Sequence, residues 1–179
     1  MRKENGDMEI GFDLRGNLRP YEKITTSLDD FKSYFVNSFA GENQKRVEIF
    51  DNYLHFIQAI QQEITKDFIH WIDGSFVTRK TIPRDIDFVT LIDYKTYEKF
   101  EALIENKYRR QAARDAFGLV DAYVVKMYPS THSKRWVSEY DLIYWRGWFS
   151  ETRKNRAKKR FSKGFIEIQF GIPKAISDA

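Results

Sequence analysis

Cysteine is absent from the 179-residue chain, which excludes disulfide bonds and thiolate metal sites. Long apolar runs are also absent, and none approaches the ~20 residues that a membrane-spanning helix needs. No apolar segment follows the charged N-terminal residues, so the sequence predicts no secretory signal. The three histidines lack metal-ligand spacing and are interpreted as structural. These absences together predict a cytoplasmic protein without a membrane segment of its own.

Aromatic and basic side chains are plentiful. Hydrophobic residues make up 42% of the chain and aromatic residues 16%, enough to bury a core. The net charge of +4 suits a partner that carries phosphates. The basic tract from Arg153 to Lys163 has two open interpretations, a solvated loop or a contact to a triphosphate or a nucleic-acid backbone.

Apolar periodicity predicts helices and short strands. Ser27 is the expected N-cap of a first helix that follows a turn-rich arm and ends near Gly41. Further helices are expected at residues 47–64, 94–117 and 130–148, and strands at residues 68–73, 85–92, 119–125 and 164–170. This order predicts an α/β fold in which helices cover a small mixed sheet, with an N-terminal helical extension. We expect residues 1–66 to form an arm and helices that pack on a single compact core, residues 67–179.

The most informative stretch is a short turn followed by an acidic pair. Gly74 and Ser75 directly follow a predicted strand, and such a turn offers backbone N–H groups and a hydroxyl to phosphate oxygens. Asp85 and Asp87 lie two positions apart on the next predicted strand, so their side chains share one face. Two carboxylates this close repel each other unless a cation lies between them. The pair therefore predicts a divalent metal site.

A third carboxylate, Asp121, lies among apolar residues of the next predicted strand. Burying an acid there is costly without a partner, so we expect Asp121 to join the same site. A phosphate-binding turn beside metal-binding carboxylates is the arrangement that phosphoryl transfer requires. Asp73 and Asp93, at the ends of predicted strands, are interpreted as turn or capping residues. Tyr123 is interpreted as a core residue in preference to a platform for base stacking.

Gly74-Ser75, the Asp85-x-Asp87 pair and the later Asp121 resemble the minimal signature of the DNA polymerase beta-like nucleotidyltransferase superfamily. More narrowly, residues 74–87 are similar to an uncharacterised bacterial branch of that superfamily, of the kind found in toxin–antitoxin and phage-defence operons. Matches at residues 16–20, 145–149 and 163–165 extend the resemblance over nearly the whole chain, although only the central motif is specific.

The resemblance implies a nucleotidyltransferase-type sheet and two-metal phosphoryl transfer with Mg²⁺ or Mn²⁺. Asp85 and Asp87 would bind both ions, and Asp121 would bind the catalytic ion and help to deprotonate the attacking hydroxyl. The usual second glycine of the turn is missing, so side chains would share in gripping the phosphates. The nucleotide contacts are accordingly assigned to Gly74, Ser75, Thr78, Lys80, Arg153 and Lys163.

The implied activity is transfer of a nucleoside monophosphate from an NTP or dNTP to an acceptor hydroxyl. The acceptor would be a protein, a tRNA or a growing oligonucleotide, and an operon-encoded partner protein or an oligomer is compatible with this activity. One alternative is a non-catalytic nucleotide-binding or antitoxin-like module of the same fold, against which the three acids argue. Another is a glycosyltransferase that holds a sugar nucleotide with its Asp-x-Asp pair, which leaves Gly74 and Ser75 unexplained.

Overall fold

The computed structural model describes residues 10–39 and 44–171. Five strands form one mixed sheet in the order β3-β7-β4-β5-β6, and β1 pairs with β2 in a separate small sheet. The strands are β1 (Gly11–Phe12), β2 (Leu18–Arg19), β3 (Lys23–Thr25), β4 (Phe68–Asp73), β5 (Ile86–Asp93), β6 (Val120–Met127) and β7 (Phe165–Phe170). The predicted class, a mixed α/β fold with a small sheet covered by helices, is confirmed at this level.

The helices of the described residues surround the sheet. They are α1 (Leu28–Phe35), the 3-10 helix η1 (Asn37–Phe39), α2 (Gln44–Glu63), α3 (Tyr94–Lys99), α4 (Glu101–Lys107), α5 (Arg110–Phe117) and α6 (Arg135–Phe149). None of them is both long enough and apolar enough to cross a lipid bilayer.

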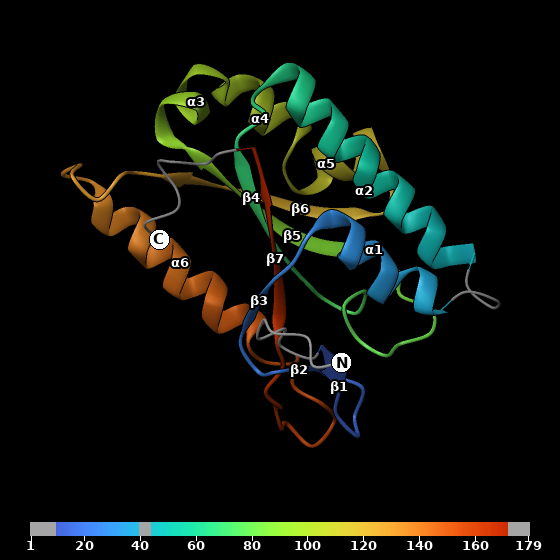
Figure 1. Ribbon diagram of the computed structural model, residues 1–179. Helices are drawn as coiled ribbons and strands as arrows, with labels where there is room; N and C mark the ends of the chain where they lie inside the picture. Colours follow the sequence, from blue (N-terminus) through green and yellow to red (C-terminus); the bar gives the residue numbers. More distant parts are fainter. Residues whose placement is uncertain (1–9, 40–43, 172–179) are drawn as a thin grey trace, which may run out of the picture.

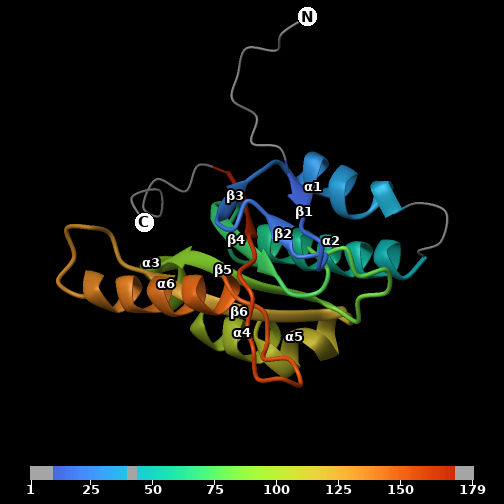
Figure 2. The same ribbon diagram turned by 90° about the horizontal axis from the view of Figure 1, so that it is seen from below.

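The sheet lies between two layers of helices. Figure 1 shows α1 and α2 on one side of the sheet and α6 on the other. Strand β4 runs antiparallel to both β5 and β7, whereas β5 and β6 are parallel. Parallel neighbours need a crossover, and here α3, α4 and α5 supply it, with α5 packed beside β6 (Figure 2).

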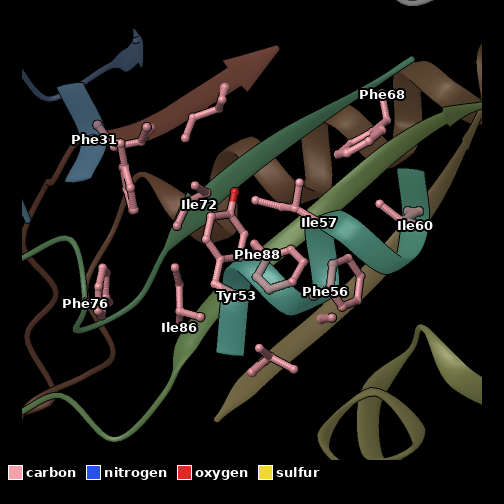
Figure 3. Close-up of a cluster of buried hydrophobic side chains, with 14 of the residues drawn as sticks. Phe31, Tyr53, Phe56, Ile57, Ile60, Phe68, Ile72, Phe76, Ile86 and Phe88 are labelled. Atoms are coloured by element: carbon pink, nitrogen blue, oxygen red, sulfur yellow. The ribbon is translucent and has the colours of Figure 1, made fainter. Parts of the chain in front are cut away.

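Alternation along the strands sends side chains into two separate cores. The larger core lies under α1 and α2, where Tyr53 and Phe56 of α2 contact Phe88 of β5 with ring centroids 5.2 and 4.8 Å apart (Figure 3). The smaller core lies under α6, where Trp71 and Val89 of the sheet pack with Leu142 and Phe149. Each large apolar side chain buried in this way contributes roughly 1.5–3 kcal/mol.

Several local predictions need correction. The expected long helix over residues 94–117 is three short helices, because the chain leaves helical geometry at Phe100 and again at Tyr108 and Arg109. Helix α6 begins at Arg135 and not at Ser130. The turn-rich arm contains β1, β2 and β3, and β3 is an edge strand of the main sheet beside β7. Strands of two or three residues are too short to show an alternating pattern.

Other predicted positions agree with the structure. Ser27 accepts a hydrogen bond from the Asp30 backbone N–H and caps α1, as expected. Asp93 accepts from the backbone N–H groups of Lys95 and Thr96 and caps α3, which confirms its assignment as a capping residue. The first helix ends before the predicted Gly41, which lies outside the described residues.

His70 is a polar residue of β4 that lies among the aromatic rings of the larger core. Its side chain is fully buried, and its Nδ1 shares a hydrogen bond of 2.8 Å with the Tyr53 hydroxyl. Its Nε2 is buried without a hydrogen-bond partner among the described residues. Burial lowers the pKa of His70 from 6.5 to about 3. The rings of Phe56, Phe68, Phe88 and Phe170 also lie beside it.

Acidification is therefore expected to destabilise the fold through His70. The unfolded chain binds a proton at this histidine below pH 6.5, whereas the folded chain excludes it down to about pH 3, so stability falls as the pH drops through this window. Between about pH 7.5 and pH 5 the contribution lost is roughly 2 kcal/mol. Urea denaturation across this range should show a steeper loss for the wild type than for His70→Gln. His55→Gln, at an exposed position, should keep the wild-type slope, and equal slopes for all three proteins would refute the assignment.

Candidate active site

Three carboxylates form a row across the sheet. In the strand register Asp73 of β4 lies opposite Asp87 of β5, and Asp87 lies opposite Asp121 of β6. All three lie on the face of the sheet that α6 covers, because side chains alternate along a strand and Trp71, two positions from Asp73, packs on that face. Asp85 lies two residues before Asp87, immediately outside β5 and not within it as predicted. Pairing of the strands thus brings Asp73, which was not predicted to take part in the site, beside the predicted acids.

The assignment of Asp73 as a turn or capping residue is wrong. Asp73 is the last residue of β4, is buried, and forms an ion pair with Lys163, whose Nζ lies 2.6 Å from Asp73 Oδ2. Burial raises the pKa of Asp73, and the Lys163 ammonium opposes that shift. The ammonium of Lys163, which was predicted to bind phosphate, is therefore already paired with a carboxylate. The pair connects the segment before β7 to the end of β4.

Gly74 allows the turn after β4 to pass close to Asp87. Its φ of +79° lies in the left-handed region, which glycine adopts at no steric cost. A Cβ added at Gly74 would lie 1.7 Å from Asp87 Oδ2. The glycine is therefore required by the neighbouring carboxylate as well as by the turn.

Gly74→Ala is accordingly expected to displace the Asp87 carboxylate and to strain the turn. The left-handed conformation costs an alanine about 1–2 kcal/mol, and a displacement on the order of 1 Å at a reacting centre can lower a rate about 10²-fold. Gly147→Ala is the matched control, because a Cβ there meets nothing within 4 Å and the residue lies within α6. Urea denaturation and turnover of both variants test this. If Gly74→Ala has the wild-type turnover rate, the close approach of residue 74 to the Asp87 carboxylate is not needed for activity.

One pocket of about 400 Å³ collects all the predicted site residues. Its volume is within the range of small-molecule sites. The predicted members are Gly74, Ser75, Thr78, Lys80, Asp85, Asp87, Asp121, Arg153 and Lys163. The lining also includes residues that the sequence did not assign to the site: Asn17, Asp73, Arg84, Trp148, Phe149, Glu151 and Thr152, together with Arg160 of the basic tract. The basic tract thus contributes Arg153, Arg160 and Lys163 to the same pocket as the acidic row.

Electrostatics within the pocket disfavour charge on the central carboxylate. Burial raises the pKa of Asp87 to about 7, with further repulsion from Asp85, Asp73 and Asp121. Burial also raises the pKa of Asp121, while nearby Arg114 opposes the shift. Asp85 is held by Arg114, whose Nη2 lies 3.0 Å from Asp85 Oδ2. A cation placed at Asp87 would relieve the repulsion that raises its pKa.

The loop that follows Gly74 is anchored from behind by Arg46. This α2 side chain is fully buried, and its guanidinium donates to the carbonyl oxygens of Phe76, Thr78 and Lys80 at 2.7, 2.9 and 2.6 Å. It also donates to the Phe35 carbonyl at 2.7 Å, which ties the loop to the end of α1. The Thr78 hydroxyl donates to the Ser75 carbonyl at 2.8 Å and closes the turn internally.

The β1–β2 turn holds the same loop from its other side. The backbone N–H of Arg79 donates to the Gly16 carbonyl at 2.9 Å. Asn17, the next residue, reaches the pocket lining. The segment between residues 16 and 20, which is part of the resemblance seen in the sequence, therefore supports the turn that was predicted to bind phosphate.

The carboxylates of the pocket are donors of the chemical kind that a divalent cation takes. No group of three or more histidine or acidic side chains converges as a ready metal site within residues 10–39 and 44–171, and Asp85 would have to exchange Arg114 for the cation. Two observations still favour cation binding: Asp87 is crowded by like charges, and the buried Oδ1 of Asp73 has no hydrogen-bond partner in the described part of the chain. Carboxylate oxygens are the donors that Mg²⁺ and Mn²⁺ prefer, so Asp87 and Asp121 are the first candidate ligands.

Comparison with known proteins adds a family and no activity. No curated protein and no solved structure shows significant similarity to the chain. A family model described as a family of unknown function (DUF6932) matches residues 10–169. The match includes every residue of the acidic row and of the loop after Gly74. The chain therefore belongs to the DUF6932 family.

Proposed function

We propose that the chain is a metal-dependent nucleotidyltransferase, which moves a nucleoside monophosphate from a nucleoside triphosphate to an acceptor hydroxyl. The observation that carries the proposal is the acidic row Asp73–Asp87–Asp121, which shares one pocket with Lys80, Arg84 and the arginines of the basic tract. Carboxylates beside basic side chains match a ligand that carries a divalent cation and several phosphates.

In the proposed reaction, the groups of the pocket have separate roles. The acceptor oxygen attacks the α-phosphorus, the bond from that phosphorus to the bridging oxygen of the β-phosphate breaks, and pyrophosphate leaves. The hydroxyl proton passes to Asp121, the carboxylate of β6 that lines the pocket. Bound Mg²⁺ or Mn²⁺ supplies stabilisation of the charge on the phosphoryl oxygens. Gly74, Ser75 and Lys80 hold the departing phosphates.

A non-catalytic nucleotide-binding module is the second candidate, and one observation favours it. Asp85, a predicted metal ligand, is paired with Arg114. If Arg114 occupies the place of a metal ion at Asp85, the protein could still bind a nucleotide but would not catalyse metal-dependent transfer.

Incubation with each ribo- and deoxynucleoside triphosphate, with Mg²⁺ or Mn²⁺ and bulk RNA or DNA, is expected to release pyrophosphate. Asp121→Asn should lower that rate about 10²–10⁴-fold, the contribution typical of a general base. Asp51→Asn, at an exposed position of α2, is the matched control and should retain the wild-type rate. Nucleotide binding without pyrophosphate release under every condition would favour the non-catalytic module. Turnover of sugar nucleotides alone would favour glycosyl transfer.

A further inference from the structure

A second pocket, of about 500 Å³, opens beside the first along α6 and β6. The two pockets share Asp87, Asp121, Trp148, Phe149 and Arg153. A ligand in the second pocket therefore lies beside the carboxylates proposed to act on the acceptor hydroxyl. The nucleotide and the acceptor would enter the same centre from two adjoining pockets.

Exposed aromatic side chains follow α6 at intervals of one helical turn. Trp136, Tyr140, Tyr144 and Trp148 are four residues apart, and they are 67%, 69%, 53% and 49% exposed. Tyr144 and Trp148 are stacked, with ring centroids 6.4 Å apart and planes 11° apart. Apolar rings that stay exposed in such a row mark a binding surface. Tyr140, Tyr144 and Trp148 also line the second pocket.

The spacing of this row suits successive bases of a single strand. Four residues of helix rise about 6 Å, more than the 3.4 Å between stacked bases of one strand in a duplex. A strand lying along α6 would therefore be extended, with its bases unstacked from one another and free to stack on the rings. Paired and stacked bases of a duplex do not offer their faces in this way.

The charges around the row complement a phosphate backbone. Arg110 and Arg153 line the second pocket, as does Arg109, which forms an ion pair with Glu105. Asp141 and the two shared acids complete the charged groups of the lining. The Arg110 guanidinium lies 5.9 Å from the centroid of the Tyr123 ring, also in the lining. The neighbouring loop adds the exposed residues Lys154, Arg156, Lys158, Lys159 and Arg160. A basic surface beside exposed rings distinguishes a nucleic-acid site from a purely apolar interface between proteins.

We infer that the acceptor is a single-stranded nucleic acid, whose bases stack on the aromatic row of α6 and whose terminal hydroxyl reaches Asp121. This inference rests on the proposed function and specifies its acceptor. In the transfer step the 3′ oxygen of the strand forms a bond to the α-phosphorus, pyrophosphate departs and the hydroxyl proton goes to the Asp121 carboxylate. The strand is thereby extended by one nucleotide.

The test is fluorescence anisotropy with a labelled oligonucleotide of about 12 nucleotides, as RNA and as DNA, each single-stranded and as a duplex. The wild type should bind the single strands more tightly than the duplexes, and its affinity should fall as salt is raised. Tyr140→Ala and Tyr144→Ala should each weaken single-strand binding on the order of tenfold. Tyr34→Ala removes a similarly exposed tyrosine from α1, on the other side of the sheet, and is the control.

The outcomes separate this inference from the proposed function. Pyrophosphate release from a nucleoside triphosphate, combined with single-strand affinity that is equal in the wild type and in both tyrosine variants, would overturn the acceptor assignment alone. Tyrosine-dependent single-strand binding without pyrophosphate release would retain the nucleic-acid site and overturn the transfer reaction. Concentration-dependent self-association that is lost in both tyrosine variants, with no oligonucleotide binding, would assign the row to an interface between copies of the chain. Melting curves of the variants verify that they fold.

Discussion

Replacing Asp87 with asparagine is expected to abolish the proposed nucleotidyl transfer and, at the same time, to make the folded protein more stable. Asp87 is the middle carboxylate of the row, opposite Asp73 on one side and Asp121 on the other. Loss of a carboxylate that we propose helps to bind the cation should lower turnover by about 10³-fold or more, because charge stabilisation by a bound cation is worth several kcal/mol. The Asp87→Asn side chain keeps the size and removes the charge.

The gain in stability follows from the same crowding. Burial, together with Asp85, Asp73 and Asp121, raises the pKa of Asp87 from 3.8 to about 7, so the charged form costs the folded state free energy at higher pH. Removing the charge should raise the free energy of unfolding by about 1–3 kcal/mol near pH 8 in metal-free buffer. The gain should shrink as the pH falls through 7 toward 4, because the wild-type carboxyl of the folded state then becomes protonated.

Urea denaturation in a chelating buffer and pyrophosphate release measure the two effects. Mn²⁺ should raise the melting temperature of the wild type and have less effect on Asp87→Asn, since a ligand that binds the folded state stabilises it by mass action. Asp51→Asn should resemble the wild type in all three measurements. A variant at position 87 that retains turnover, or that is less stable at pH 8 than the wild type, would show that the row does not hold a cation in the proposed manner.

Replacing Arg46 with methionine is expected to cost about 3–5 kcal/mol of stability, because buried acceptors would lose a charged donor. The guanidinium of Arg46 donates to four backbone carbonyls, three of them in the loop after Gly74. It also lies 3.9 Å from the ring centroid of Phe39. Burial lowers the pKa of Arg46 to about 10, so it remains charged at neutral pH.

The shape of the guanidinium distinguishes this anchor from a simple positive charge. Arg46→Lys keeps the charge, but its three donors share one nitrogen and cannot span carbonyls that the planar fork reaches with two. It should therefore recover less than half of the lost stability. Both variants should also weaken nucleotide binding, since the loop carries Thr78 and Lys80 into the pocket.

Lys45→Met is the control for Arg46. Lys45 is the preceding residue of α2 and forms a surface pair with Glu48, a type of contact worth less than about 1 kcal/mol. The measurement is the urea midpoint of each variant together with its nucleotide affinity. If Arg46→Met unfolds within about 1 kcal/mol of the wild type, the loop is held by other contacts.

The sequence was sufficient for features that depend on neighbouring residues. The strands at Phe68–Asp73, Ile86–Asp93 and Phe165–Phe170 follow from short apolar runs bounded by turn residues, and α2 follows from its three- and four-residue apolar steps. The motif from Gly74 to Asp87 identified the pocket, because residues of one turn and the start of the next strand stay close in any fold that pairs those strands. These relations span only a few residues, so residue spacing along the chain is enough to predict them.

The contributions of Asp73 and Arg46 depend on partners far along the chain. Asp73 joins the acidic row only through its register with Asp87, and its ion pair is with Lys163, 90 positions away. In the sequence, Arg46 is one charged residue among several in an amphipathic helix. The backbone carbonyls to which it donates lie up to 34 positions away. Register and burial arise when strands and helices pack, so residue spacing does not encode them.

Sequence alone therefore determined the fold class, most of the elements and the acidic motif, because each depends on periodicity or on short spacing. Tertiary structure decided which carboxylates lie in one row. It also decided the ion pairs of Lys163 with Asp73 and of Arg114 with Asp85. It also decided that the aromatic row of α6 stays exposed beside the pocket, which helical spacing alone does not indicate. The physical reason is that side-chain burial and charge pairing are properties of the packed chain, set by what lies opposite each residue.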